Sequence, residues 1–269
     1  MADEVVLLDT WISMFGMRVR VALAEKGVNY DYKEQDLKNK SSLLLQMNPI
    51  HKKIPVLIHN DRPVCESANI VEYIDEVWNG KSPFMPSDPY ERAQARFWVD
   101  FIDKMIYETW KKMWLSEGEE HEAWKKELIS IFKQLEDALG DKTFFGGDTF
   151  GFLDIALIPF SCWFYTFETY GNFTMEAECP KLMTWVKRCS QREAVSNTLP
   201  DHNKLMYVAD NVSCTIVSLL RGLMFGMRAR IVLSEKGVSY EYKGTRCQEQ
   251  EFFASTDESN SQEGSNSDP

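Results

Sequence analysis

The stretch that decides the fold runs Val5-Val-Leu-Leu-Asp-Thr-Trp-Ile-Ser-Met-Phe-Gly-Met-Arg-Val-Arg-Val-Ala-Leu-Ala-Glu-Lys-Gly27. Its opening, Val5–Leu8, is short, apolar and β-branched at its start, which is typical of a strand covered on both faces. From Phe15 onward, apolar residues recur at the i, i+4, i+7, i+8 spacing of a helix laid on a sheet. Gly27 then follows a lysine and is typical of a helix end. The stretch therefore predicts a buried strand, a short turn and a helix.

Ser13 lies in the predicted turn, where the strand gives way to the helix. A serine there can cap the helix by accepting a hydrogen bond from a free backbone N–H group. The same place also favours the binding of an anion, because free N–H groups and the positive end of the helix dipole meet there. On this spacing, capping is the commoner role of a serine, and anion binding is the alternative.

Composition limits the function classes. The 269 residues hold 41 Asp and Glu against 30 Lys and Arg, a net charge of −11 without a basic block, which argues against nucleic-acid binding. The six cysteines are scattered, with neither a CxxC pair nor a Cys/His group at zinc spacing, so we expect a reducing compartment and no metal. We see no signal peptide and no apolar run near the roughly 20 residues that span a bilayer. These features predict a cytoplasmic protein without a membrane partner.

The residues after the opening stretch predict a small α/β domain. The pattern indicates strands at Val28–Lys33, Ile54–His59 and Pro63–Ser67, a helical turn at Leu43–Met47 and a helix at Ala68–Trp78. Ser67 precedes the last helix, and we expect it to cap that helix. The order β-α-β-(α)-β-β-α is typical of a mixed sheet with helices on its faces. Residues 79–89 hold three prolines, a glycine and two serines, and predict a linker.

Beyond the linker, apolar residues keep a helical period, which predicts an all-helical domain. We expect helices at Pro89–Leu115, Glu119–Leu139, Asp154–Tyr170, Pro180–Gln191 and Asp201 to about Val212. The third of these is almost wholly apolar, which favours the centre of the bundle. Gly151 and Asp154 at its start form a capping box in which glycine replaces the usual serine or threonine. Asp154 is therefore expected to secure the turn largely alone.

The C-terminal part contains an internal repeat. Met224–Lys243 repeats Met14–Lys33 with fourteen of the twenty residues identical, and Leu223 takes the place of Ser13. The copy lacks the later strands that would complete a sheet, so it cannot bury its own apolar face. From Gln248 onward the chain has no Lys or Arg, which is typical of disorder. The expected plan is an α/β domain at 1–78, a linker at 79–89, a helical domain at 90–212, a partial repeat of residues 3–34 at 213–244 and a disordered acidic tail at 245–269.

Four motifs occur in order ahead of the helical half: Trp11-Ile-Ser-Met-Phe-Gly-Met-Arg-Val19, Asn48-Pro-Ile-His-Lys-Lys-Ile-Pro-Val-Leu57, Cys65-Glu-Ser67 and Glu72-Tyr-Ile-Asp-Glu-Val-Trp78. With them, the chain from residue 3 to about 207 resembles a plant tau-class glutathione S-transferase. The resemblance implies a thioredoxin-like N-terminal domain that binds glutathione, followed by a helical-bundle C-terminal domain that binds the acceptor substrate.

The resemblance also implies roles for matching residues. Ser13 would donate a hydrogen bond to the glutathione sulfur and favour the thiolate over the thiol, whose ordinary pKa is about 8.5. It further implies glutathione contacts from Lys40, Lys53, Ile54, a cis Pro55, Glu66 and Ser67, electrostatic support of Glu66 from Arg18 and Asp103, and an acceptor wall of Phe15, Lys111, Trp114 and Trp163. Simpler interpretations stay open: a solvated role for either lysine, an edge-strand proline at 55, and ordinary helical core for the two tryptophans.

The function implied by the resemblance is conjugation of the glutathione thiolate to hydrophobic electrophiles, as in detoxification and stress responses, by a homodimer that needs no metal or cofactor besides glutathione as co-substrate. Relatives that transfer thiols carry cysteine where this chain has Ser13, and a hydroxyl group cannot form their mixed disulfide. The chain departs from the family pattern at about Val208–Val212. The alternative is therefore a non-catalytic protein that binds glutathione conjugates or planar apolar ligands.

Overall fold

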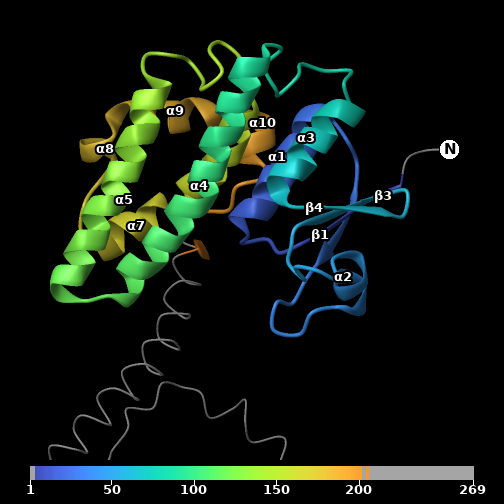
Figure 1. Cartoon of the computed structure of the whole chain (residues 1–269), viewed down its shortest axis with the longest axis horizontal. Coiled ribbons are helices and arrows are strands. Elements are labelled where there is room, and N and C mark those ends of the chain that lie inside the picture. The colour runs from blue at the N-terminus through green and yellow to red at the C-terminus, as the bar shows by residue number, and fades with distance from the viewer. Residues whose placement is uncertain (1–3, 202–203, 206–269) are drawn as a thin grey trace, which may run out of the picture. The chain divides into compact units, whose positions relative to one another are not determined.

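The structure is a computed structural model that describes residues 4–201 and 204–205. Most of the helix predicted from Asp201 to Val212, the partial repeat at 213–244 and the tail at 245–269 lie outside these residues. In the described part, a sheet with its helices is followed by a helical bundle that lies beside it (Figure 1). None of the described helices has the length and apolar character needed to cross a membrane.

The first half is a mixed four-stranded sheet in the order β2-β1-β3-β4. Its strands are β1 (Val5–Asp9), β2 (Asp31–Glu34), β3 (Val56–His59) and β4 (Arg62–Cys65). β1 pairs with β2 in parallel and with β3 antiparallel, and β3 pairs antiparallel with β4. This is a thioredoxin-like arrangement, and the strands predicted from the sequence are present with shifted ends.

Helices cover both faces of this sheet. They are α1 (Met14–Lys26), α2 (Ser42–Met47) and α3 (Ser67–Val77). In β1, Leu7 belongs to the large core that includes residues of α1 and α3, whereas Leu8 packs in a separate cluster with Leu44 of α2. Successive strand residues point to opposite faces, so an unbroken apolar run such as β1 is buried on both. The prediction of a doubly covered strand is confirmed.

Both ends of α1 follow the sequence signals. Ser13 is the N-cap residue, and its Oγ accepts a hydrogen bond from the backbone N–H of Gly16 at 3.1 Å. At the other end, Gly27 adopts a left-handed conformation with φ of 70°, which glycine takes without steric cost. The helix therefore begins and ends where the sequence predicts.

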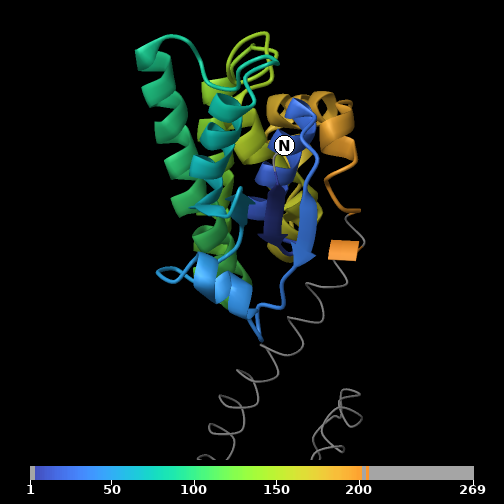
Figure 2. The same cartoon turned by 90° about the vertical axis from the view of Figure 1, so that its right-hand side faces the viewer.

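The second half is a bundle whose longest members, α4 (Pro89–Leu115) and α5 (Gly118–Leu139), pack side by side (Figures 1 and 2). The remaining elements are α6 (Phe152–Leu157), the 3-10 helix η1 (Ile158–Trp163), α7 (Phe164–Gly171), α8 (Met175–Glu178), α9 (Pro180–Cys189) and α10 (Glu193–Ser196). All six residues of α6 are buried, which agrees with the predicted central position.

Two predictions about helices were wrong in detail, and two short helices were not predicted. The single helix expected at Asp154–Tyr170 is broken into α6, η1 and α7, because Pro159 lacks an N–H group and its ring clashes with the carbonyl four residues earlier. Ser67 is the first residue of α3 and not its cap, and Glu66 takes the cap position with φ of 69°. The short helices α8 and α10 were not predicted, since four residues are too few to show a period.

Two arginines join the two halves. The guanidinium of Arg18, on α1, donates through Nε to the carbonyl of Ala156 in α6 at 2.8 Å, and Arg18 is fully buried. Farther along α1, Glu25 receives two hydrogen bonds from Arg192 beside α10, at 2.8 and 2.7 Å. The two arginines therefore tie α1 to the bundle at two separate points.

Candidate active site

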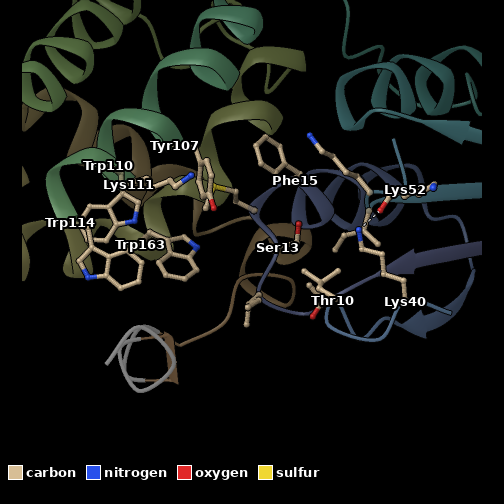
Figure 3. A pocket seen from close by; sticks show the side chains of 15 residues that line it. Thr10, Ser13, Phe15, Lys40, Lys52, Tyr107, Trp110, Lys111, Trp114 and Trp163 are labelled. Atoms are coloured by element: carbon tan, nitrogen blue, oxygen red, sulfur yellow. Dashed lines mark hydrogen bonds between the residues drawn. The ribbon is translucent and has the colours of Figure 1, made fainter. Parts of the chain in front are cut away.

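A cavity of about 530 Å³ opens where β1 passes into α1. The β1–α1 turn and the start of α1 contribute Thr10, Ile12, Ser13, Met14 and Phe15; the loops before β3 contribute Leu37, Lys40, Lys52, Lys53 and Ile54; and α4 and η1 contribute Tyr107, Trp110, Lys111, Trp114 and Trp163. Figure 3 shows Ser13 between a group of lysines and a group of aromatic side chains. The cavity thus has a cationic side and an aromatic side, with a hydroxyl group between them.

Ser13 can cap α1 and still act on a ligand. Its Oγ accepts the hydrogen bond from Gly16 through one lone pair. A hydroxyl group also has one hydrogen to donate, and within the described residues no acceptor takes it. The capping role and the anion-binding role that the sequence left open are therefore compatible, because they use different parts of the same group.

A polar network holds the turn that carries Ser13. The carboxylate of Glu34, on β2, accepts hydrogen bonds from Thr10 Oγ1 at 2.6 Å and from the backbone N–H of Trp11 at 3.3 Å. Arg20, on α1, donates to the carbonyl of Trp11 at 2.9 Å. The backbone N–H of Ser13 closes the turn on the Thr10 carbonyl at 3.0 Å. The turn is thus fixed from β2, from α1 and within itself.

Asp9 is a buried carboxyl group directly behind this turn. Its nearest cation is Arg20, with Nε 3.2 Å from Oδ2, but neither carboxylate oxygen has a well-aligned hydrogen bond. The carboxylate packs so closely on Gly16 that a Cβ atom there would lie 1.8 Å from Oδ1. Burial raises the pKa of Asp9 to about 7, although Arg20 and the backbone of Thr10 act in the opposite direction. Nothing in the sequence pattern had identified this residue.

The loop before β3 brings the lysines to the cavity. Asn48, which is buried, accepts from the backbone N–H of His51 at 3.1 Å and donates to the carbonyl of Lys53 at 3.0 Å. Lys40 Nζ donates to the carbonyl of Lys52 at 2.9 Å. The peptide bond between Ile54 and Pro55 is cis, as predicted. Pro55 itself is buried and does not line the cavity.

Glu66 and Ser67 lie at the start of α3, outside the residues that line the cavity. Glu66 Oε1 lies 2.6 Å from His51 Nδ1, a contact that the sequence did not predict. Ser67 Oγ accepts from Arg18 Nη1 at 3.1 Å, and Arg18 Nη2 pairs with Asp103 at 2.5 Å. Arg18 thus contacts Ser67 and Asp103, and the carboxylate of Glu66 contacts His51. The electrostatic support of Glu66 by Arg18 and Asp103 stays a prediction.

The aromatic side of the cavity contains all four residues expected to bind the acceptor: Phe15, Lys111, Trp114 and Trp163. Trp110, one helical turn before Trp114, was missed, although its ring stacks on Trp114 at 5.8 Å between centroids and 9° between planes. The i, i+4 spacing of the two tryptophans could have identified it. The remaining lining residues were not predicted from the sequence as part of the site: Thr10, Ile12, Met14, Leu37, Lys52 and Tyr107.

Comparison with known proteins agrees with this architecture. Residues 4–76 match the glutathione S-transferase N-terminal domain, and residues 118–188 match the corresponding C-terminal domain. The chain is 77% identical over 205 residues to glutathione S-transferase 3 of soybean (Glycine max), an alignment that covers 76% of this chain and 94% of that protein. It is 64% identical over 206 residues to glutathione S-transferase U25 of Arabidopsis thaliana, covering 77% and 93% of the two chains.

Solved structures extend the comparison. The structure of rice GST1 in complex with glutathione has a TM-score of 0.76 and 42% identity, and the match covers 79% of this chain and 97% of that chain. The tau-class glutathione S-transferase of mango (Mangifera indica) has a TM-score of 0.74 and 41% identity, covering 77% and 97%. The chain therefore belongs to the glutathione S-transferase family, and within that family to the tau class.

Proposed function

We propose that this chain conjugates the thiolate of glutathione to hydrophobic electrophiles, with Ser13 as the residue that stabilises the thiolate. The observation that carries the proposal is the hydroxyl group of Ser13, which keeps a hydrogen to donate while it stands at the N-terminus of α1 between the lysines and the tryptophans. Lowering the pKa of a thiol by about two units requires roughly 2.7 kcal/mol. One charge-assisted hydrogen bond together with a helix N-terminus can supply this amount.

The remaining parts of the site fit the three charged groups of glutathione. Lys40 and Lys53 would hold the glycyl carboxylate, and the backbone of Ile54 before cis Pro55 would bind the peptide. Glu66 would take the ammonium group, and Ser67 with the N-terminus of α3 would take the γ-glutamyl carboxylate. Because the nucleophile belongs to the substrate, the reaction needs neither a metal nor a further cofactor. The thiolate forms the new C–S bond, and the leaving group departs with its electron pair.

The test is Ser13→Ala. We expect it to lower the rate of conjugation to an aryl halide by one to three orders of magnitude, about 1.4 to 4 kcal/mol, with little change in glutathione affinity. The substitution also removes a helix cap, so the matched control is Asp88→Ala, which removes the N-cap of α4. If Ser13→Ala conjugates at the wild-type rate, Ser13 has no part in the mechanism. If the wild type binds glutathione but conjugates nothing, the protein is a binding protein.

The proposed enzyme is a cytoplasmic homodimer. Support for the location comes from Cys65, Cys162, Cys179 and Cys189, all of which are free thiols. Support for self-association comes from α4, which leaves large apolar side chains on the surface, among them Tyr90 at 72% and Phe97 at 57% exposure. Light scattering would measure the mass in solution. We further propose that residues 213–244 are a partial repeat without a glutathione site, because Leu223 replaces Ser13.

A further inference from the structure

The cavity carries positive charge although the protein as a whole is acidic. The net charge of the chain is −11. Yet among the described residues that line the cavity there are four lysines and no aspartate or glutamate. A cavity lined by one sign of charge raises the local concentration of ligands of the opposite sign. The lining therefore favours anionic ligands.

The lysines are divided between the two ends of the cavity. In Figure 3, Lys40 and Lys52 lie on one side of Ser13, and Lys111 lies on the other side among Tyr107, Trp110 and Trp114. Under the proposed function, Lys40 holds the glycyl carboxylate of glutathione together with Lys53. Lys111 lies on the opposite side of Ser13 from Lys40 and Lys52, and it belongs to the acceptor side.

Lys111 is available to a ligand. Its side chain is exposed, and within residues 4–201 it makes neither a hydrogen bond nor an ion pair. Glu108, three residues earlier on the same helix, could have neutralised it but does not pair with it in the structure. The stacked rings of Trp110 and Trp114 flank Lys111 in the sequence of α4 and offer flat apolar surface next to the charge. A ligand with a flat apolar ring and one negative group would therefore complement the two tryptophan rings and the ammonium group of Lys111.

We propose that the preferred acceptors are planar, aromatic electrophiles that carry a carboxylate, and that Lys111 selects them. The proposal deepens and rests on the proposed function. The ring lies against the tryptophans and the carboxylate lies at the ammonium group of Lys111, while the thiolate attacks the electrophilic carbon. Lys111 is a specificity-determining residue and takes no part in bond making. Its charge also offsets the repulsion between the acceptor carboxylate and the thiolate.

Two acceptors that differ by one carboxylate test the proposal: 1-chloro-2,6-dinitrobenzene and 4-chloro-3,5-dinitrobenzoate. In both, the thiolate forms a C–S bond at the carbon that loses chloride. We expect Lys111→Met to lower kcat/KM for the benzoate about three- to tenfold more than for the neutral acceptor, as for the loss of a partly solvated ion pair. Lys111→Arg should keep the benzoate activity. The control is Lys104→Met, on the same helix but paired with Asp100 at 2.7 Å and outside the cavity lining.

The outcomes separate this proposal from the one on which it rests. If Lys111→Met lowers both acceptors alike, or neither, the charge of Lys111 does not select the acceptor and the inference is overturned, while conjugation of the neutral acceptor still supports the transferase function. If the wild type conjugates neither acceptor, the transferase function itself is wrong. High salt should reduce the benzoate preference of the wild type more than that of Lys111→Met.

Discussion

At the scale of single residues, Asp9 is the least expected part of the site. It stands at the end of β1, pressed against the first turn of α1, and it faces Arg20 on α1 and Glu34, Tyr30 and Tyr32 on or beside β2. Arg20 alone among these is cationic, and it also binds the Trp11 carbonyl. Burial therefore outweighs the one attraction, which explains the raised pKa.

Burying the charged carboxylate of Asp9 destabilises the folded protein, and Asp9→Asn should reveal this as a pH-dependent gain in stability. Because the pKa of Asp9 is about 7 in the folded protein and 3.8 is the ordinary value, the native state binds more protons between these limits. The wild type therefore loses stability as the pH rises from about 4 to about 7, by at most about 4 kcal/mol. Asn carries no proton to lose, so the difference in unfolding free energy between variant and wild type should grow across this window.

Denaturant unfolding at several pH values measures this difference. Asp148→Asn is the control, since Asp148 is exposed and its substitution should have the same small effect at every pH. An Asp9→Asn effect that is equal at pH 5 and pH 8 would show that Asp9 keeps an ordinary pKa in the folded protein.

At the scale of elements, α6 depends on a single carboxylate. Asp154 accepts hydrogen bonds from the backbone N–H groups of Phe145 at 3.0 Å and Gly151 at 2.9 Å, and from Trp185 Nε1 at 2.7 Å. Burial nevertheless raises the pKa of Asp154 to about 6. The carboxylate thus secures the start of α6 and also connects the preceding loop and α9 to it.

Asp154→Ala should destabilise the protein by roughly 3 kcal/mol or more, because it leaves three buried donors without an acceptor. Thermal and denaturant unfolding measure the loss, and Asp148→Ala, in the exposed part of the same loop, should stay within about 0.5 kcal/mol of the wild type. A loss for Asp154→Ala no larger than that of the control would mean that the donors find other partners.

The sequence predicted best those elements whose ends are determined by local signals, such as cap residues. Ser13 and Gly27 define α1 locally, and the unbroken apolar run of β1 announces burial on both faces. The break of the helix predicted at Asp154–Tyr170 into α6, η1 and α7 was missed, because an apolar run alone cannot distinguish an α-helix from a 3-10 helix, although the run contains Pro159.

The sequence predicted part of the site. One cavity is lined by five of the residues that the resemblance implies, and their roles remain proposals: Ser13, Lys40, Lys53, Ile54 and Lys111. The contact of His51 with Glu66 joins residues that are fifteen positions apart, and it exists only because Asn48 folds the intervening loop back. The burial of Asp9 depends on its packing against Gly16 seven positions later. Neither contact follows from spacing along the chain.

At the scale of the whole molecule, the alignments with soybean glutathione S-transferase 3 and Arabidopsis glutathione S-transferase U25 cover 76% and 77% of the chain. We predict that a chain stopped at Val212 binds glutathione within about twofold of the full-length protein, because every residue proposed to bind glutathione precedes residue 68. Calorimetry on both chains measures this affinity. A truncated chain that folds, by circular dichroism, but does not bind glutathione would contradict the prediction and assign residues 213–269 a part in the site.

Comparing conjugation by the same two chains then separates the effects on the acceptor. Equal rates would show that residues 213–269 are irrelevant to turnover. A faster truncated chain would show that they obstruct the acceptor side.

The arginines that tie α1 to the bundle have a consequence for motion. Arg18 attaches α1 to Ala156 in α6, and Arg192, beside α10, attaches to Glu25 farther along the same helix. A helix that is held at two separate points resists a hinge motion against the helices that hold it. Within residues 4–201, we therefore expect α1 and the helices that hold it to keep their relative placement while ligands enter and leave the cavity.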